Sequence, residues 1–184
     1  MKIFYDDFKN IYSQLYALPS ARIQLRRNFG KYPKDVDVKV KVAFYEVIGK
    51  CSYIRNLDNL NFYIVTLIAI QIDKLKTGID DSEILEDLKE KNMQNYLHMI
   101  YVDPNSSESQ RKRITKLLAM QYEQDGRLLS QMTKFIQSAH RDGYKINPQQ
   151  LYTDVKYWNK NYNEIPEKWA KTILNAKEGE NTND

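Results

Sequence analysis

The chain has 184 residues, of which 42% are hydrophobic, 6 are glycine and 5 are proline. The hydrophobic fraction supports a packed core and excludes a disordered chain, while the scarcity of turn-forming residues argues against a β-sandwich or β-barrel. Its 28 lysine and arginine residues exceed its 24 acidic residues, a net charge of +4 that excludes no class of partner by itself.

Apolar residues recur at spacings of three and four residues along most of the chain, which predicts helices rather than strands. In the first part of the chain we expect helices over Ile3–Ala17, from an N-cap at Ser20 to Phe29, over Val38–Lys50, over Leu60–Lys76, over a short stretch after Asp80, and over Asn92–Tyr101. The helix from Leu60 is apolar on most faces and should be the buried centre of this part. Asp80 and Glu83 have the spacing of a capping box.

The sequence Asp103-Pro104-Asn105-Ser106 interrupts the helical pattern, and we expect a domain boundary there. Three or four helices should follow, over Ser107–Tyr122, Arg127–Arg141, Pro148–Trp158 and Pro166–Ala176. Asn147 before Pro148 is typical of an N-cap with proline at the first helical position. The sequence therefore predicts an all-α fold of two consecutive helical bundles, residues 1–102 and 107–178, and a disordered tail, residues 179–184.

Charge is sorted along the chain. Residues 20–55 contain nine basic and three acidic residues, and residues 105–145 contain eight basic and four acidic residues. Residues 80–92 have six acidic residues against two lysines, which we interpret as a solvated helix face because the carboxylates spread around the axis. Sorted positive charge favours polyanion binding, since affinity for nucleic acids comes from neutralised phosphates and released counterions.

Three of the expected helices carry basic residues away from their apolar faces. Positions seven apart nearly eclipse on a helix, so Arg127, Lys134 and Arg141 line up on one side. The helix before it presents Lys112, Arg113 and Lys116, and the second helix presents Arg22, Arg26 and Arg27. Like charges four residues apart cost a helix about 0.2–0.5 kcal/mol, a cost that a bound anion would remove. The alternative for each stripe is an ordinary solvated face.

The sequence contains no motif for reading bases, so any contact with nucleic acid should be to its backbone, with little sequence preference. The 14 tyrosines could supply stacking surfaces, but most are better explained as edges of the core. His98, His140 and Cys51 lack clustered partners, so we expect no catalytic site, no metal and no cofactor. We find no signal-peptide pattern and no apolar stretch long enough to span a bilayer, and expect a cytoplasmic protein.

Several stretches together resemble the CasB family, the small subunit of type I-E CRISPR Cascade complexes. They are the arginine-bearing segment Ala21–Arg27, the pair Phe44-Tyr45, the helix Gln110–Leu118, and the tryptophan-bearing part from Ile146 to Trp158 and on to Trp169-Ala170. Their order and spacing agree with the family over about Ser20–Leu174. One departure is Thr133-Lys134, where the family often carries two arginines, so the strength of that contact is in question.

The resemblance implies two helical bundles, partner Cascade subunits that hold a guide RNA, and a second copy of the chain in the complex. It also implies non-sequence-specific contacts with the target and displaced DNA strands that stabilise the R-loop, while base pairing supplies specificity and a separate nuclease cleaves. By position, the contacts should come from Arg22, Arg26, Arg27, Arg111, Arg113 and Lys116, and helix geometry adds Lys134 and Arg141. An alternative is a helical adaptor whose basic patches bind acidic partner proteins; a stand-alone enzyme is disfavoured.

Overall fold

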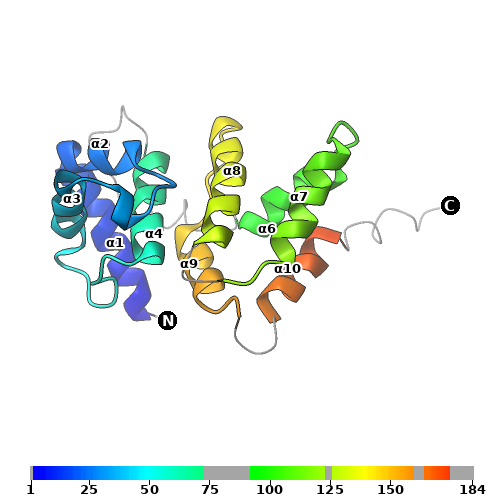
Figure 1. Cartoon of the computed structure of the whole chain (residues 1–184). Coiled ribbons are helices and arrows are strands. Elements are labelled where there is room, and N and C mark those ends of the chain that lie inside the picture. Colours follow the sequence, from blue (N-terminus) through cyan, green and yellow to red (C-terminus); the bar gives the residue numbers. More distant parts are fainter. Residues whose placement is uncertain (1, 73–91, 123–125, 160–163, 175–184) are drawn as a thin grey trace. The chain divides into compact units, whose positions relative to one another are not determined.

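The computed structural model describes residues 2–72, 92–122, 126–159 and 164–174. These residues form helices and no strand, so the predicted all-α class is confirmed (Figure 1). Contacts between Cα atoms divide the chain into unit 1, residues 1–90 with 147–152, and unit 2, residues 91–146 with 153–184.

The described part of unit 1 before residue 73 contains four helices and one 3-10 turn. They are α1 (Lys2–Ala17), α2 (Pro19–Arg27), η1 (Pro33–Asp35), α3 (Val38–Ile48) and α4 (Asn59–Gln71). α2 packs against α3 and α4, and α1 contacts all three. Every residue from Leu60 to Gln71 is buried, as the apolar sequence predicted, because α4 meets packed neighbours on all sides.

Several helix ends in unit 1 differ from the prediction, and α3, for example, ends at Ile48 instead of Lys50. α2 begins at Pro19, not after an N-cap at Ser20, because proline has no N–H to satisfy and its fixed φ suits a first helical turn. It ends at Arg27, two residues before the predicted Phe29, where the side chain of Asn28 donates to the Gln24 carbonyl at 2.8 Å. α4 ends at Gln71, and the predicted continuation over residues 73–76 lies outside the described residues.

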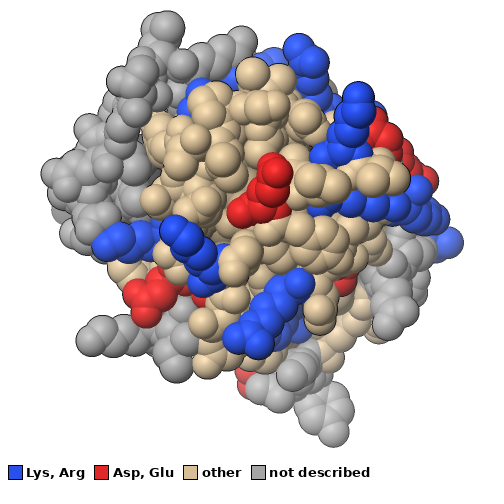
Figure 2. All heavy atoms as spheres, turned by 90° about the vertical axis from the view of Figure 1, so that its left-hand side faces the viewer, with Lys and Arg blue, Asp and Glu red and all other residues tan. Residues whose placement is uncertain are grey.

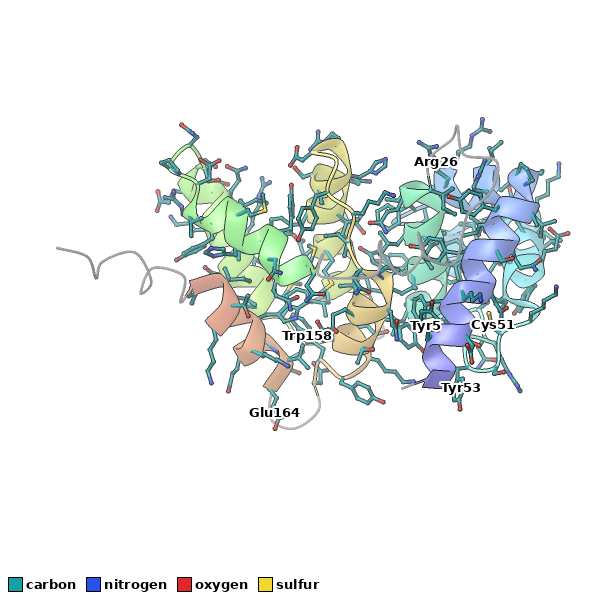
Figure 3. The ribbon with its side chains drawn as sticks, turned by 180° about the vertical axis from the view of Figure 1, so that it is seen from behind. Tyr5, Arg26, Cys51, Tyr53, Trp158 and Glu164 are labelled. Carbon is teal, nitrogen blue, oxygen red and sulfur yellow. The ribbon has the colours of Figure 1, made fainter. Side chains whose placement is uncertain are left out.

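Asp7 connects α1, through hydrogen bonds, to the segment between α3 and α4. Its carboxylate accepts the backbone N–H groups of Ser52 and Tyr53, each at 2.7 Å, and of Ile54 at 2.9 Å. Only 1% of Asp7 is exposed, so these donors replace the water that the charge loses on burial. The neighbouring Cys51 thiol lies 3.6 Å from the Asp7 carbonyl oxygen (Figure 3). Burial, and then the charge of Asp7, raise the pKa of Cys51 to about 12.

Unit 2 contains the remaining described helices. They are α6 (Met93–Val102), α7 (Glu108–Leu118), α8 (Arg127–Arg141), α10 (Glu164–Leu174) and the end of α9 (Pro148–Lys156), whose residues up to 152 belong to unit 1. Whereas the sequence placed the helix over residues 92–101 in the first bundle, α6 packs against α10, α7 and α8. Two polar contacts fix it there: the Tyr96 hydroxyl donates to Asp142 at 2.6 Å, and His98 Nδ1 lies 3.0 Å from the Ile173 carbonyl oxygen.

Two tryptophans form the centre of unit 2. The rings of Trp158 and Trp169 meet edge to face with centroids 5.0 Å apart, and both residues are fully buried. Trp158 Nε1–H donates to the Met120 carbonyl at 2.7 Å, and Trp169 Nε1–H donates to the buried carboxylate of Asp154 at 2.8 Å. Both indole donors are thus satisfied inside the core, as buried polar groups must be.

Sequence signals located most helix ends of unit 2. α8 has the predicted bounds, and the Asn147 side chain accepts the N–H of Gln150 at 2.9 Å at the predicted N-cap of α9. α7 begins with a capping box between Ser107 and Gln110 but ends at Leu118, four residues before the predicted Tyr122. α9 stops at Lys156, and α10 starts at Glu164. The helix expected after Asp80 and the tail 179–184 lie outside the described residues.

Candidate nucleic-acid interface

The arginines of α2 project from a short amphipathic helix. Ala21 and Leu25 are buried against the bundle, which leaves Arg22 and Arg26 half-buried and Arg27 exposed. The Arg22 guanidinium lies 5.8 Å from the centre of the Tyr16 ring, so that ring holds it by a cation–π contact. Arg26 stands near the end of α2 (Figure 3).

Part of the clustering on α2 has a structural explanation. Arg26 and Arg27 occupy the last turn, where the partial negative charge of the helix end favours cations by about 0.3–1 kcal/mol. This contribution offsets the repulsion between neighbouring arginines. The charge cluster on α2 therefore does not by itself require an anionic ligand, and the basic helices of unit 2 have to be considered separately.

On α7, one of the predicted contacts is engaged inside the protein. Arg111 donates through Nε to the carbonyl of Tyr101 at 3.1 Å and through Nη2 to the carbonyl of Asp103 at 2.8 Å. Its guanidinium is thereby bound to the end of α6 and is only half-exposed. The sequence could not distinguish it from Arg113, which has the same chemistry and lies two positions further along the helix.

Arg113 and Lys116 are exposed, and α7 buries Ile114 and Leu117 on its other side. Their neighbour Lys112 pairs with Glu108 at 2.7 Å, so the charge of Lys112 is already compensated. Within the described part of the chain, neither Arg113 nor Lys116 forms an ion pair. These two side chains are therefore the cations on α7 that are available to a phosphate.

On α8, Lys134 and Arg141 are exposed and lie on the side away from the buried face, which confirms the predicted stripe. Seven residues rise about 10.5 Å along a helix, so the stripe that starts at Arg127 spans about 21 Å. Arg127 is exposed as well, although its side chain takes part in other interactions within the protein. An extended row of cations suits a polymeric anion better than a small one.

The missing arginine at position 133 does not interrupt this row. Thr133 is 9% exposed, and its hydroxyl donates to the Leu129 carbonyl at 2.8 Å. It lies with Met132 and Ile136 on the buried face of α8. The departure from the family pattern therefore removes no charge from the exposed side of the helix.

Sequence reasoning left open which tyrosines are available for stacking, and the structure separates them. Tyr12, Tyr63, Tyr96 and Tyr152 are buried core residues, whereas Tyr45, Tyr53 and Tyr157 are exposed. A helical wheel could have found Tyr45, which lies seven residues from the exposed Val38. Tyr53 lies outside any helix and had no periodic signal.

Across residues 2–72, 92–122, 126–159 and 164–174, no three His, Cys, Asp or Glu side chains are grouped to hold a metal ion. The same residues include no helix of the length and apolarity needed to cross a membrane. The acidic run at residues 80–90 lies outside the described residues.

The observed features define an all-helical protein of two units whose helices α2, α7 and α8 present cations to solvent. No family model and no curated protein matches the sequence. Among solved structures, the chain is similar to the crystal structure of CasB from M. ruber, with a TM-score of 0.56 and 21% sequence identity. The similarity covers 91% of this chain and 96% of that one, so the resemblance to CasB extends to the fold.

Proposed function

We propose that this chain is the non-catalytic small subunit of a type I-E CRISPR Cascade complex and stabilises the R-loop by contacting the target and displaced DNA strands. In this proposal it binds partner subunits that carry the guide RNA, and a second copy of the chain is present in the same complex. The observation that carries the proposal is the exposed row of cations on α7 and α8, in a fold similar to that of CasB.

Four residues of unit 2 are the principal contacts: Arg113, Lys116, Lys134 and Arg141. All four are exposed on helices whose opposite faces are packed, so their side chains can reach phosphates without any rearrangement of the core. Cations on long side chains neutralise phosphates but do not read base edges. Binding should therefore be insensitive to base sequence, and specificity would come from pairing between guide and target.

In unit 1, Arg26 and Arg27 are the corresponding candidates. We assign Arg22 a smaller share, because the Tyr16 ring already holds its guanidinium. We assign none to Arg111, because a phosphate would have to displace the two carbonyl groups that it binds. These assignments rank the eight predicted residues by what their side chains already contact.

The test is a salt titration of DNA binding. Fluorescence anisotropy of the purified chain with two unrelated single strands should give equal affinities that fall log-linearly with salt from about 50 to 200 mM. If the four residues of unit 2 each neutralise one phosphate, the slope of log K against log salt should be about −3. Two different affinities, or a slope near zero, would contradict backbone binding.

Charge reversal then tests the sites within the assembled complex. Replacing Arg26, Arg27 and Arg113 by glutamate should lower retention of DNA by the complex at an unchanged melting temperature. Lys171→Glu on α10 is the matched control, since it changes one exposed charge on a different helix. If the reversed complex retains DNA normally but captures less of an acidic partner protein, the adaptor function is favoured instead.

A further inference from the structure

One exposed stripe of α3 is apolar. Val38, Val42 and Tyr45 follow one another at spacings of four and three residues and therefore form one stripe along the helix. The exposed fractions are 72% for Val38 and 51% for Val42. Branched aliphatic side chains this exposed, and in register, are unusual on a helix that already buries its opposite face with Val40, Phe44 and Val47.

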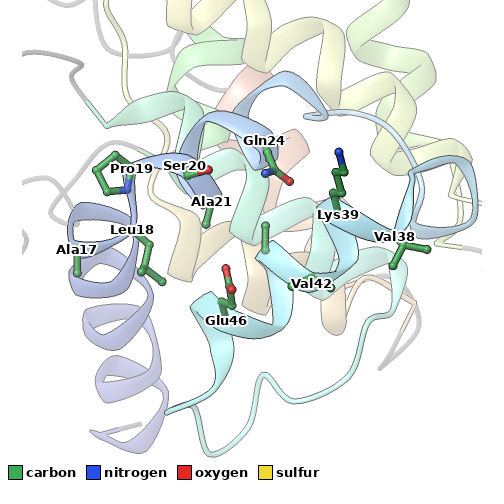
Figure 4. Close-up of a pocket in the computed structure, with 11 residues that line it drawn as sticks. Ala17, Leu18, Pro19, Ser20, Ala21, Gln24, Val38, Lys39, Val42 and Glu46 are labelled. Atoms are coloured by element: carbon green, nitrogen blue, oxygen red, sulfur yellow. The ribbon is translucent and has the colours of Figure 1, made fainter.

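This stripe borders a hollow between α2 and α3 (Figure 4). The hollow has a volume of about 520 Å³. Much of its wall is aliphatic, contributed by Ala17, Leu18, Pro19, Ala21, Val42 and Ala43. A groove and stripe of this kind can accept the apolar face of a helix or an extended segment.

Polar groups at this groove restrict what could occupy it. Gln24 on α2 and Glu46 on α3 both line the hollow (Figure 4). The Gln24 Oε1 atom is buried and, among the residues that the structure describes, has no hydrogen-bond partner. An occupant that brings an N–H or O–H donor would satisfy this oxygen, whose isolation otherwise costs about 1–3 kcal/mol.

Charged side chains flank the stripe on both sides: the cations of Lys39 and Lys41, and the carboxylate of Glu46, which lies about 20° from Lys39 around the helix. Lys39 lies about 100° around the helix from Val38 in one direction. Lys41 lies about 100° from Val42 in the other direction, so the two lysines are on opposite sides of the stripe. Figure 2 shows this side of the molecule as a largely uncharged surface with an acidic side chain within it and lysine, arginine and further acidic side chains around it. A complementary surface would be apolar opposite the stripe, would carry carboxylates opposite Lys39 and Lys41, and would bring hydrogen-bond donors to Glu46 and Gln24.

From this geometry we infer that the α2–α3 groove docks a segment of another protein subunit whose aliphatic side chains are flanked by carboxylates. A nucleic acid fits less well, because phosphates cannot compensate for covering Val38 and Val42 and would leave their own charges poorly solvated. The inference rests on the proposed function only for its partner, a subunit of the same assembly. The groove lies on unit 1 and includes none of the four cations assigned to DNA in unit 2.

Incorporation into the assembly provides the first measurement. With Val42→Glu, and separately Val38→Glu, the chain should join the assembled complex at least tenfold less, while DNA binding by the free chain stays unchanged. A loss of incorporation with Val38→Glu cannot be attributed to misfolding, because a carboxylate in the first turn of α3 stabilises the helix. Val102→Glu, at an exposed valine of α6, is the matched control and should incorporate normally.

A photo-crosslinking residue at position 42 in the assembled complex then identifies the occupant. The expected product is a peptide of another subunit with aliphatic residues between Asp or Glu. Crosslinks from position 42 to nucleic acid or to a second copy of this chain would overturn the inference. A crosslinking yield no higher than that of the same residue placed at position 102 would also overturn it. If the unsubstituted chain does not join the complex, the proposed function is wrong. If it joins and the Val42→Glu variant joins equally well, the proposed function stands and only the docking site is wrong.

Discussion

Arg111 and Tyr101 are joined by a hydrogen bond of 3.1 Å from the guanidinium Nε to the carbonyl oxygen, which ties the first half of α7 to the last turn of α6. A second bond of 2.8 Å, from Nη2 to the carbonyl of Asp103, closes the turn between the two helices. Carbonyls at a helix end lack intrahelical partners, so this arginine acts as a cap supplied by the next helix. The role of Arg111 is structural, whereas the side chain of Arg113 is available to bind a ligand.

The first prediction separates these two arginines. Arg111→Ala should lower the free energy of unfolding by about 1–3 kcal/mol, because two carbonyls lose a charged donor. Arg113→Ala should change stability by no more than about 0.5 kcal/mol but reduce the salt slope of DNA binding by about 1. Urea denaturation and anisotropy on both variants check this. If Arg111→Ala instead left stability unchanged and lowered DNA affinity as much as Arg113→Ala does, the structural role assigned to Arg111 would be wrong.

The second prediction concerns the buried carboxylate of unit 1. Asp7→Asn should destabilise the chain by about 2–4 kcal/mol, because an amide cannot accept the three N–H groups that the carboxylate binds. The adjacent Asp6 is exposed, so Asp6→Asn is the control and should leave the denaturation midpoint unchanged. Similar midpoints for the two variants would mean that the Asp7 contacts contribute little.

The third prediction is a dependence of stability on pH. Burial, and then the hydrogen bond to Asp142, raise the pKa of Tyr96 to about 12. Since the unfolded phenol ionises near pH 10, this stabilisation is complete below about pH 10 and is lost as the pH rises towards 12. Burial raises the pKa of Tyr144 as well, which acts in the same direction.

Tyr96→Phe should therefore lose about 1 kcal/mol near neutral pH and show a shallower decline of stability above pH 10. Chemical denaturation from about pH 7 to about pH 11 measures both effects. The exposed Tyr45, changed to phenylalanine, is the control and should retain the alkaline decline. A decline of the same steepness in Tyr96→Phe would assign the effect to other groups.

The fourth prediction addresses the missing arginine of α8. Thr133→Arg should destabilise unit 2 by about 2–4 kcal/mol without raising DNA affinity, because position 133 faces the packed side of the helix. Thr133→Val is a control of similar volume that removes only the hydroxyl bond to Leu129. A stable Thr133→Arg chain with tighter DNA binding would instead show that the arginine reaches the exposed face.

Local sequence determined much of the secondary structure. The capping signals at Ser107 and Asn147 and the apolar spacing of residues 127–141 each depend on residues within one or two turns, and all three located their helices. The prediction failed where a proline and the next residue competed for one helix start, at Pro19 and Ser20. It also failed at the end of α7, where the chain beyond Leu118 bonds to a residue distant in sequence, as the Met120 carbonyl does to Trp158.

What the sequence by itself determined is the helical class and the side of each helix that carries cations, since both follow from a periodicity of 3.6 residues. Only the tertiary structure decided that Arg111 is bound and Arg113 is not, that α6 packs with α7 and α10, and that the stripe of α3 is exposed. The physical reason is that these features depend on contacts between residues distant in sequence. Such contacts, like the three N–H hydrogen bonds that the Asp7 carboxylate accepts, produce no periodic pattern in the sequence.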